Sequence, residues 1–333
     1  MSNFVKNKIR LIPLAAGGVI FLALLYSLGP AAVLSSIAGG KPGYIIITSI
    51  FFMLPNFLRI YKWRLMMDRV AADITLTETV AVYFSSKFWG MVSPMRSGEV
   101  IPALVGVKEN SCQGKLLSII LYDRMMETAQ SLMVFFIFVF LFYKIFFNAS
   151  AGFALAGISI VIAVFSVFLF SKSMGDRVLD LAVSTLSYFN KNRLTAYLSG
   201  KVEKLKKLAD EFYKATRNYF NLGFSVYTLF LTFICWAFDM LFWLVLFKAF
   251  SVDIGIWLAL ASVMVFSIMA AFAPIPGGLG AAELPFVLIL KKMGYTGEAG
   301  GIIIAARVLS AGYLTIAYNL SNHFKPANEA PGD

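Results

Sequence analysis

The chain has 333 residues, of which 59% are hydrophobic, 15% aromatic and only 14% charged, and its formal net charge at pH 7 is +11. This composition lies far from that of a soluble globular protein and is typical of an integral membrane protein. Apolar runs approach the roughly 20 residues that a helix needs to cross a bilayer, whereas a β-barrel would show short alternating segments.

Several kinds of chemistry are disfavoured by what the sequence lacks. His323 is the single histidine, and Cys112 and Cys235 lie in unrelated contexts without zinc-like spacing. No Walker A loop is present. We therefore expect no catalytic residue, no metal site, no cofactor and no nucleic-acid partner.

Six apolar runs predict full transmembrane helices, at 11-28, 43-60, 117-143, 151-170, 224-247 and 299-319. The first is interpreted as a retained anchor, because it is longer than a usual signal core and no small-residue cleavage site follows it. Two further regions, 78-107 and 256-291, are apolar but interrupted by Pro and Gly. The predicted fold is an all-α polytopic membrane protein with six full transmembrane helices and two broken hairpins.

The distribution of basic residues predicts the orientation, because short cytoplasmic loops carry excess Lys and Arg. They gather at the N-terminus, at the end of the second span and in 172-217; the first two groups are Lys6, Lys8 and Arg10, and Arg59, Lys62, Arg64 and Arg69. Both termini are thus expected in the cytoplasm, with the two hairpins re-entering from opposite sides as in an inverted repeat. Kinked full crossings in place of the hairpins would leave this orientation unchanged.

The predicted organisation has two transmembrane halves, 1-171 and 224-322, joined by the polar segment 172-223 and followed by a cytoplasmic tail, 323-333. Within 172-217 apolar residues recur at three- and four-residue steps between lysines. Such a basic amphipathic helix suits an anionic leaflet surface, although packing against the bundle is an equal alternative. A homo-oligomer is compatible with the sequence.

The two interruptions read "PMRSGE" and "PIPGGLGAAE". Pro and Gly open the helix and expose backbone donors and acceptors. The residues of this predicted backbone gate are Pro94, Gly98, Pro274, Pro276, Gly277, Gly278 and Gly280. A carboxylate, Glu99 or Glu283, is expected in the first turn of the helix after each break. There it would favour the helix start, or alternatively bind a ligand or an arginine.

Charged groups at bilayer depth normally face a protein interior or a watery cavity. Arg124 and Glu127 are three residues apart and can pair on one helix face. Arg307 lies inside the last span and needs a partner, for which Glu283 and Glu99 are candidates. Asp239 is expected to be buried, either protonated or bonded to another helix, and as a hypothesis it couples transport to protons.

The chain resembles the flippase-like transmembrane family. The resemblance rests on Arg96 and Glu99 at the first break, Arg124 opening the third span, Glu283 after the second break and Arg307 in the last span. That family includes the membrane half of bacterial lysylphosphatidylglycerol synthase/flippase proteins. The bifunctional members also carry a C-terminal aminoacyltransferase domain, whereas this sequence ends shortly after its last span, so a stand-alone domain is expected. Glu127 stands where relatives often have Asp.

The resemblance implies a lipid flippase in the cytoplasmic (inner) membrane, with membrane lipids as partners. Arginine suits phosphate, so the expected substrate-binding residues are Arg96, Arg124 and Arg307, balanced by Glu99, Glu127, Asp239 and Glu283. The alternatives are a membrane-embedded lipid-modifying transferase and a non-transporting partner of a lipid-synthesis complex.

Overall fold

In the computed structural model, the described residues are 18–70, 74–105, 113–146, 207, 210–219, 221–272 and 275–323. Helices joined by short turns make up these residues, which contain no strand, and the predicted all-α fold is confirmed for them. The chain divides into two compact units: unit 1 comprises 1–61, 75–102 and 233–333, and unit 2 comprises 62–74 and 103–232. The predicted span 151-170 and most of 172-217 lie outside the described residues.

Three described helices are long and apolar enough to cross a membrane: α3 (Pro42–Arg69), α10 (Leu222–Ala249) and α13 (Thr296–His323). They confirm the predicted spans 43-60, 224-247 and 299-319 but extend beyond them. The largest extension is at the C-terminal end of α3, where the predicted span ended at residue 60 and left Lys62 beyond it. Lys62 instead lies inside the helix.

The described part of the first predicted span, 11-28, is helical, and the chain bends sharply just after it. The helix Gly18–Ser27 is followed by α2 (Pro30–Ala38), and the two are bent by 85°. Gly29 has φ +82° and Pro30 begins α2, so a left-handed residue and a proline together produce the turn. Counted as one broken span, this pair raises the number of candidate crossings among the described residues to four.

The first interrupted region begins with α4 (Leu76–Val92), which is started by a capping box between Thr75 and Glu78. The helix ends before Pro94, and the short 3₁₀ helix η1 (Pro94–Val100) and α5 (Ile101–Val105) follow. The predicted break is therefore confirmed. Next in the chain is α6 (Gln113–Phe146).

The second interrupted region contains α11 (Ile256–Phe272), the 3₁₀ turn η3 (Pro276–Gly278) and α12 (Glu283–Lys292). This break is confirmed as well, although Pro274 lies outside the described residues. Neither α11 nor α12 reaches the length of a full crossing, which requires about 20 residues.

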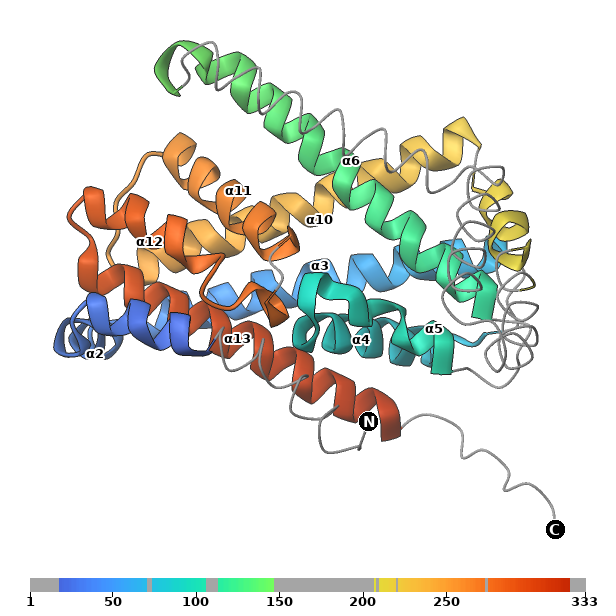
Figure 1. The fold of residues 1–333 in the computed structure, drawn as a ribbon, viewed down its shortest axis with the longest axis horizontal. Coiled ribbons are helices and arrows are strands. Elements are labelled where there is room, and N and C mark those ends of the chain that lie inside the picture. The colour runs from blue at the N-terminus through green and yellow to red at the C-terminus, as the bar shows by residue number, and fades with distance from the viewer. Residues whose placement is uncertain are drawn as a thin grey trace, which may run out of the picture. The chain divides into compact units, whose positions relative to one another are not determined.

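Unit 1 has a core of aromatic and aliphatic side chains contributed by α10, α11, α12 and α13. Trp243 lies at its centre, with ring centroids 5.0 Å from Phe266 and 5.3 Å from Phe286. Along α13, Gly297 and Gly300 allow α2 to approach closely, because a Cβ on Gly297 would lie 2.8 Å from the Ala32 carbonyl oxygen. Figure 1 shows α2 and α4 lying along α13.

Unit 2 is held together by polar as well as aromatic contacts. Lys62 and Asp123 are each 1% exposed and form an ion pair of 2.6 Å, and Trp63 Nε1 donates to Asp123 over 3.0 Å. Tyr219 stacks on Tyr122 with centroids 4.6 Å apart, so the described end of the basic segment packs its apolar face on protein. Burial raises the pKa of the Tyr219 phenol.

Candidate functional site

Unit 1 brings the two helix breaks together. The turn η1 packs against η3, and η3 also packs against the end of α4. The approach is close at Gly277, where a Cβ would lie 2.9 Å from the Met91 carbonyl oxygen. Two motifs that are far apart in the sequence thus form one site.

The glycines of the second break have the backbone conformation that other residues rarely adopt. Gly277 has φ +60° and Gly278 has φ +67°. Both values lie in the left-handed region, where a Cβ is strained. The proline before them and the positive φ values explain why the helix stops, which is the role the sequence predicted for this motif.

Glu283 is the centre of the second break and is fully buried. Its Oε2 accepts a hydrogen bond from the Gly280 amide over 2.7 Å, and its Oε1 accepts one from Arg307 Nε over 2.5 Å. Arg307 Nη1 also donates to the Gly277 carbonyl over 3.0 Å. One carboxylate in the first turn of α12 therefore binds the backbone before the helix and also holds an arginine, so the two roles that the sequence left open coexist. Of the two candidate partners of Arg307, the structure selects Glu283.

The members of this pair differ in exposure. The Glu283 side chain is 0% exposed, whereas that of Arg307 is 23% exposed, and the guanidinium lies 5.7 Å from the centroid of the Phe266 ring. The positive member is consequently the one that can be reached from outside the protein interior.

The first break has a similar arrangement. Arg96 and Glu99 form an ion pair of 2.7 Å in which Glu99 is 3% exposed and Arg96 is 34% exposed. Arg96 has φ +54°, an unusual conformation for an arginine. Glu99 occupies space left by Gly90, which has no Cβ. The prediction that Glu99 follows the break in the next helix is wrong, because it lies within η1 itself.

The remaining predicted gate residues lie in the same turns. The Gly98 amide donates to Ser93 Oγ over 2.6 Å, which closes η1 against the end of α4. Pro94 begins η1 and Pro276 begins η3. Gly280, with φ +83°, packs directly on the helix Gly18–Ser27, because its Cβ would meet Ile20 at 2.6 Å.

Sequence reasoning overlooked Lys87, a buried cation on α4 whose ammonium lies 5.5 Å from the centroid of the Tyr83 ring. It is one helical turn from Gly90, against which the Glu99 carboxylate packs. A signal was available, since this lysine interrupts the apolar run "VAVYFSSKFWGMV".

Two other predicted site residues, Arg124 and Glu127, belong to unit 2. They form the expected pair, with Arg124 Nη1 2.5 Å from Glu127 Oε2, and both side chains are 25% exposed. Asp239 belongs to unit 1, but the expectation that it is buried is wrong, because its side chain is 36% exposed. Its partner on another helix is Arg59, which the sequence prediction placed at the end of the second span.

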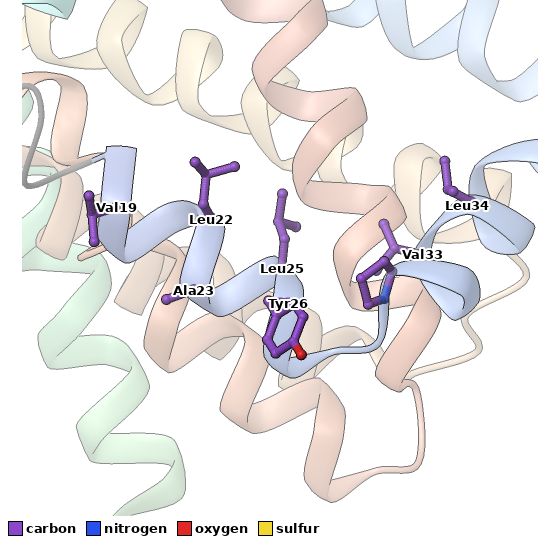
Figure 2. A pocket seen from close by; sticks show the side chains of 8 residues that line it. Val19, Leu22, Ala23, Leu25, Tyr26, Val33 and Leu34 are labelled. Atoms are coloured by element: carbon purple, nitrogen blue, oxygen red, sulfur yellow. The ribbon is translucent and has the colours of Figure 1, made fainter.

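An apolar pocket of about 710 Å³ lies in the bend between the helix Gly18–Ser27 and α2. Figure 2 shows the side chains that line it, among them Leu22, Leu25, Tyr26 and Val33. The contact between Ile20 and Gly280 connects the first of these helices to the second break. Unit 1 therefore combines a charged site with an apolar pocket on a neighbouring helix.

The family described as the lysylphosphatidylglycerol synthase TM region matches residues 10–317. No curated protein and no solved structure matches the chain.

Proposed function

The chain belongs to the family of the lysylphosphatidylglycerol synthase TM region, and from this membership we propose that it is a lipid flippase. The family match confirms the resemblance drawn from the sequence and supports a lipid-related role in a membrane. The finer proposal is that an anionic or amphiphilic lipid moves between leaflets through a polar intramembrane cavity, without chemical change.

The observation that carries this proposal is the Glu283–Arg307 pair at a helix break. A fully buried carboxylate holds a partly exposed guanidinium beside opened backbone, and Arg96 of the neighbouring break repeats the arrangement with Glu99. Guanidinium groups bind phosphate in bidentate fashion. A phosphate-bearing headgroup is thus the ligand that this site fits.

The apolar pocket on the helix Gly18–Ser27, which contacts the second break through Ile20 and Gly280, supports a lipid rather than a water-soluble anion. Its lining is formed almost entirely by hydrocarbon, and a lipid tail could lie there while the headgroup is at the charged site. Burial of a hydrocarbon chain is favoured in proportion to its apolar area.

We further propose the membrane arrangement that the sequence predicts. The chain has six crossings and two re-entrant hairpins in an inverted repeat, with both termini in the cytoplasm and the protein in the cytoplasmic membrane. Breaks in opposite halves that meet at one place are typical of transporters built from such repeats. The packing of η1 on η3 supports this interpretation.

Reconstitution of the full chain in liposomes with a fluorescent phosphatidylglycerol tests the proposal. Dithionite quenches only the outer-leaflet probe, so the rate of loss of the protected fraction measures leaflet exchange. Arg307→Gln and Glu283→Gln are expected to slow exchange about tenfold, which corresponds to about 1.4 kcal/mol in the barrier. Glu298→Gln, which removes a carboxylate from the first turn of α13, is the matched control and should exchange as the original chain does.

The same experiment separates the alternatives. A new lipid species in the extracted liposomes would identify a transferase and reject transport as the activity. Neither exchange nor a new species would favour a non-transporting partner. Exchange that is unaffected by both Arg307→Gln and Glu283→Gln would reject this site.

A further inference from the structure

A second charged pair, Arg59 and Asp239, lies in unit 1 away from the helix breaks. It joins α3 to α10, with Arg59 Nη2 2.5 Å from Asp239 Oδ2. Both helices are candidate membrane spans of 28 residues. The pair is therefore a charged feature of two transmembrane helices that the proposed headgroup site does not use.

The position of this pair along the helices places it near their middle. α3 begins where α10 ends, because the Lys41 amide donates to the Ala249 carbonyl over 2.9 Å. At 1.5 Å per residue, Arg59 is about 26 Å and Asp239 about 15 Å from that shared end. Each side chain leans toward the N-terminus of its own helix, so in these antiparallel helices the two lean toward each other.

The Arg59 and Asp239 side chains are too exposed to face the hydrocarbon core of a bilayer. The Asp239 side chain is 36% exposed and that of Arg59 is 19% exposed. Charged groups at bilayer depth cost several kcal/mol unless they face a protein interior or a polar cavity. This face of α3 and α10 must accordingly border a polar space.

Aromatic side chains connect this pair to the site at the second break. Trp243 is one turn after Asp239 on the same face of α10, and its ring meets Phe266 edge-on with centroids 5.0 Å apart. The Arg307 guanidinium lies over the same Phe266 ring, 5.7 Å from its centroid. Two charged pairs are thus separated by a short aromatic partition, the kind of apolar constriction that can gate a polar path.

We propose that Arg59 forms a second phosphate-binding station, with Asp239 as the resident counter-ion that the phosphate replaces. The ligand class is a phosphate group, and the proposed source is the headgroup of an anionic phospholipid. This inference rests on the proposed function, since it adds a second station on the path of the same lipid. Carboxylate and phosphate both match the guanidinium fork, which makes the exchange of one for the other chemically direct.

The proposal predicts opposite signs for the two members of the pair. Asp239→Asn removes the competitor and should increase binding of phosphatidylglycerol, whereas Arg59→Gln removes the guanidinium that donates to the phosphate and should decrease it, each by about tenfold. An ion pair that only holds α3 to α10 would give no such opposition. Arg59→Lys keeps the charge without the fork and should bind more weakly than the original chain. It also serves as the second variant if Arg59→Gln does not fold.

Native mass spectrometry of the purified full chain in detergent measures this binding at equilibrium. Phosphatidylglycerol and diacylglycerol, which lacks the phosphate, are titrated separately, and inorganic phosphate is added as a competitor. Retention of phosphatidylglycerol over diacylglycerol with opposite shifts in the two variants supports the station. Displacement by inorganic phosphate at equal concentration would reject a lipid as the source. Arg64→Gln and Asp68→Asn are matched controls, because that pair is on the same helix at 2.8 Å, and they should not change binding.

Shifts of the same sign in Asp239→Asn and Arg59→Gln, or no shift in either, would overturn the proposal, as would an equal shift in the controls. The measurement does not depend on transport. A chain that binds as expected but does not exchange lipid would contradict the proposed function alone, whereas exchange without this binding pattern would contradict the second station alone.

Discussion

Lys62 and Asp123 show what a single buried charge costs in this protein. Both side chains are 1% exposed, and Lys62 Nζ also donates to Thr232 Oγ1 over 2.9 Å. Removing one partner leaves the other charge buried without compensation, at a cost of about 3–5 kcal/mol, whereas replacing both can be close to neutral. The pair is therefore expected to behave non-additively.

The corresponding experiment compares Lys62→Met, Asp123→Asn and the double variant by thermal unfolding in detergent. Each single variant should lower the unfolding temperature strongly. The double variant should recover most of the loss, because the amide oxygen that replaces the Asp123 carboxylate can still accept a hydrogen bond from Trp63 Nε1. Losses in the double variant equal to the sum of the singles would show that the two charges do not interact. Asp68→Asn, at a half-exposed pair, should have little effect.

At this scale the sequence was informative about local partners and uninformative about distant ones. The Arg124–Glu127 pair was predicted because its members are three residues apart on one helix face. Arg59 and Lys62 were counted only as basic residues at the cytoplasmic end of the second span, because their partners, Asp239 and Asp123, lie on other helices. Counting charges along a chain treats every such residue as solvated, and that assumption fails when a distant carboxylate is available.

Among the elements, the helix breaks were predicted better than the helix ends. Pro and Gly act through the local backbone, so η1 and η3 occur where the sequence placed them. The C-terminal end of α3 was placed too early. Where this helix ends depends on whether its charged side chains find buried partners, and those partners lie on other helices. The 85° bend at Gly29 was missed, although a glycine followed by a proline was visible inside the apolar N-terminal region.

The conformation of the second break makes a prediction for Gly277. Gly277→Ala introduces a Cβ at φ +60° and 2.9 Å from the Met91 carbonyl oxygen, so we expect a loss of about 1–3 kcal/mol and a lower unfolding temperature. Gly312→Ala is the matched control, because it lies within α13 with no atom within 4 Å of its added Cβ. It should stabilise the helix by up to about 1 kcal/mol. Equal effects of the two substitutions would contradict the described turn.

For the whole molecule, the packing of unit 1 constrains its topology more firmly than charge counting does. The Lys41 amide meets the Ala249 carbonyl, and the Tyr295 hydroxyl donates to the Asp253 carbonyl over 3.1 Å. The connections after α2, α10 and α12 must consequently lie at one end of the unit (Figure 1). Because the three connections lie at one end of unit 1, all three must be on the same side of the membrane.

Single cysteines introduced into a Cys112→Ser/Cys235→Ser chain test this topology in intact cells. Lys41→Cys, Asp253→Cys and Gly294→Cys should all react with a membrane-impermeant maleimide, because the proposed orientation places these exposed positions outside. Asn221→Cys precedes α10 at its other end, so it should react only after permeabilisation. If the two groups exchanged their reactivity, the orientation would be reversed and the fold of unit 1 retained. If Lys41→Cys and Asp253→Cys reacted from opposite sides, the antiparallel arrangement of α3 and α10 would itself be wrong, and with it the depth at which Arg59 meets Asp239.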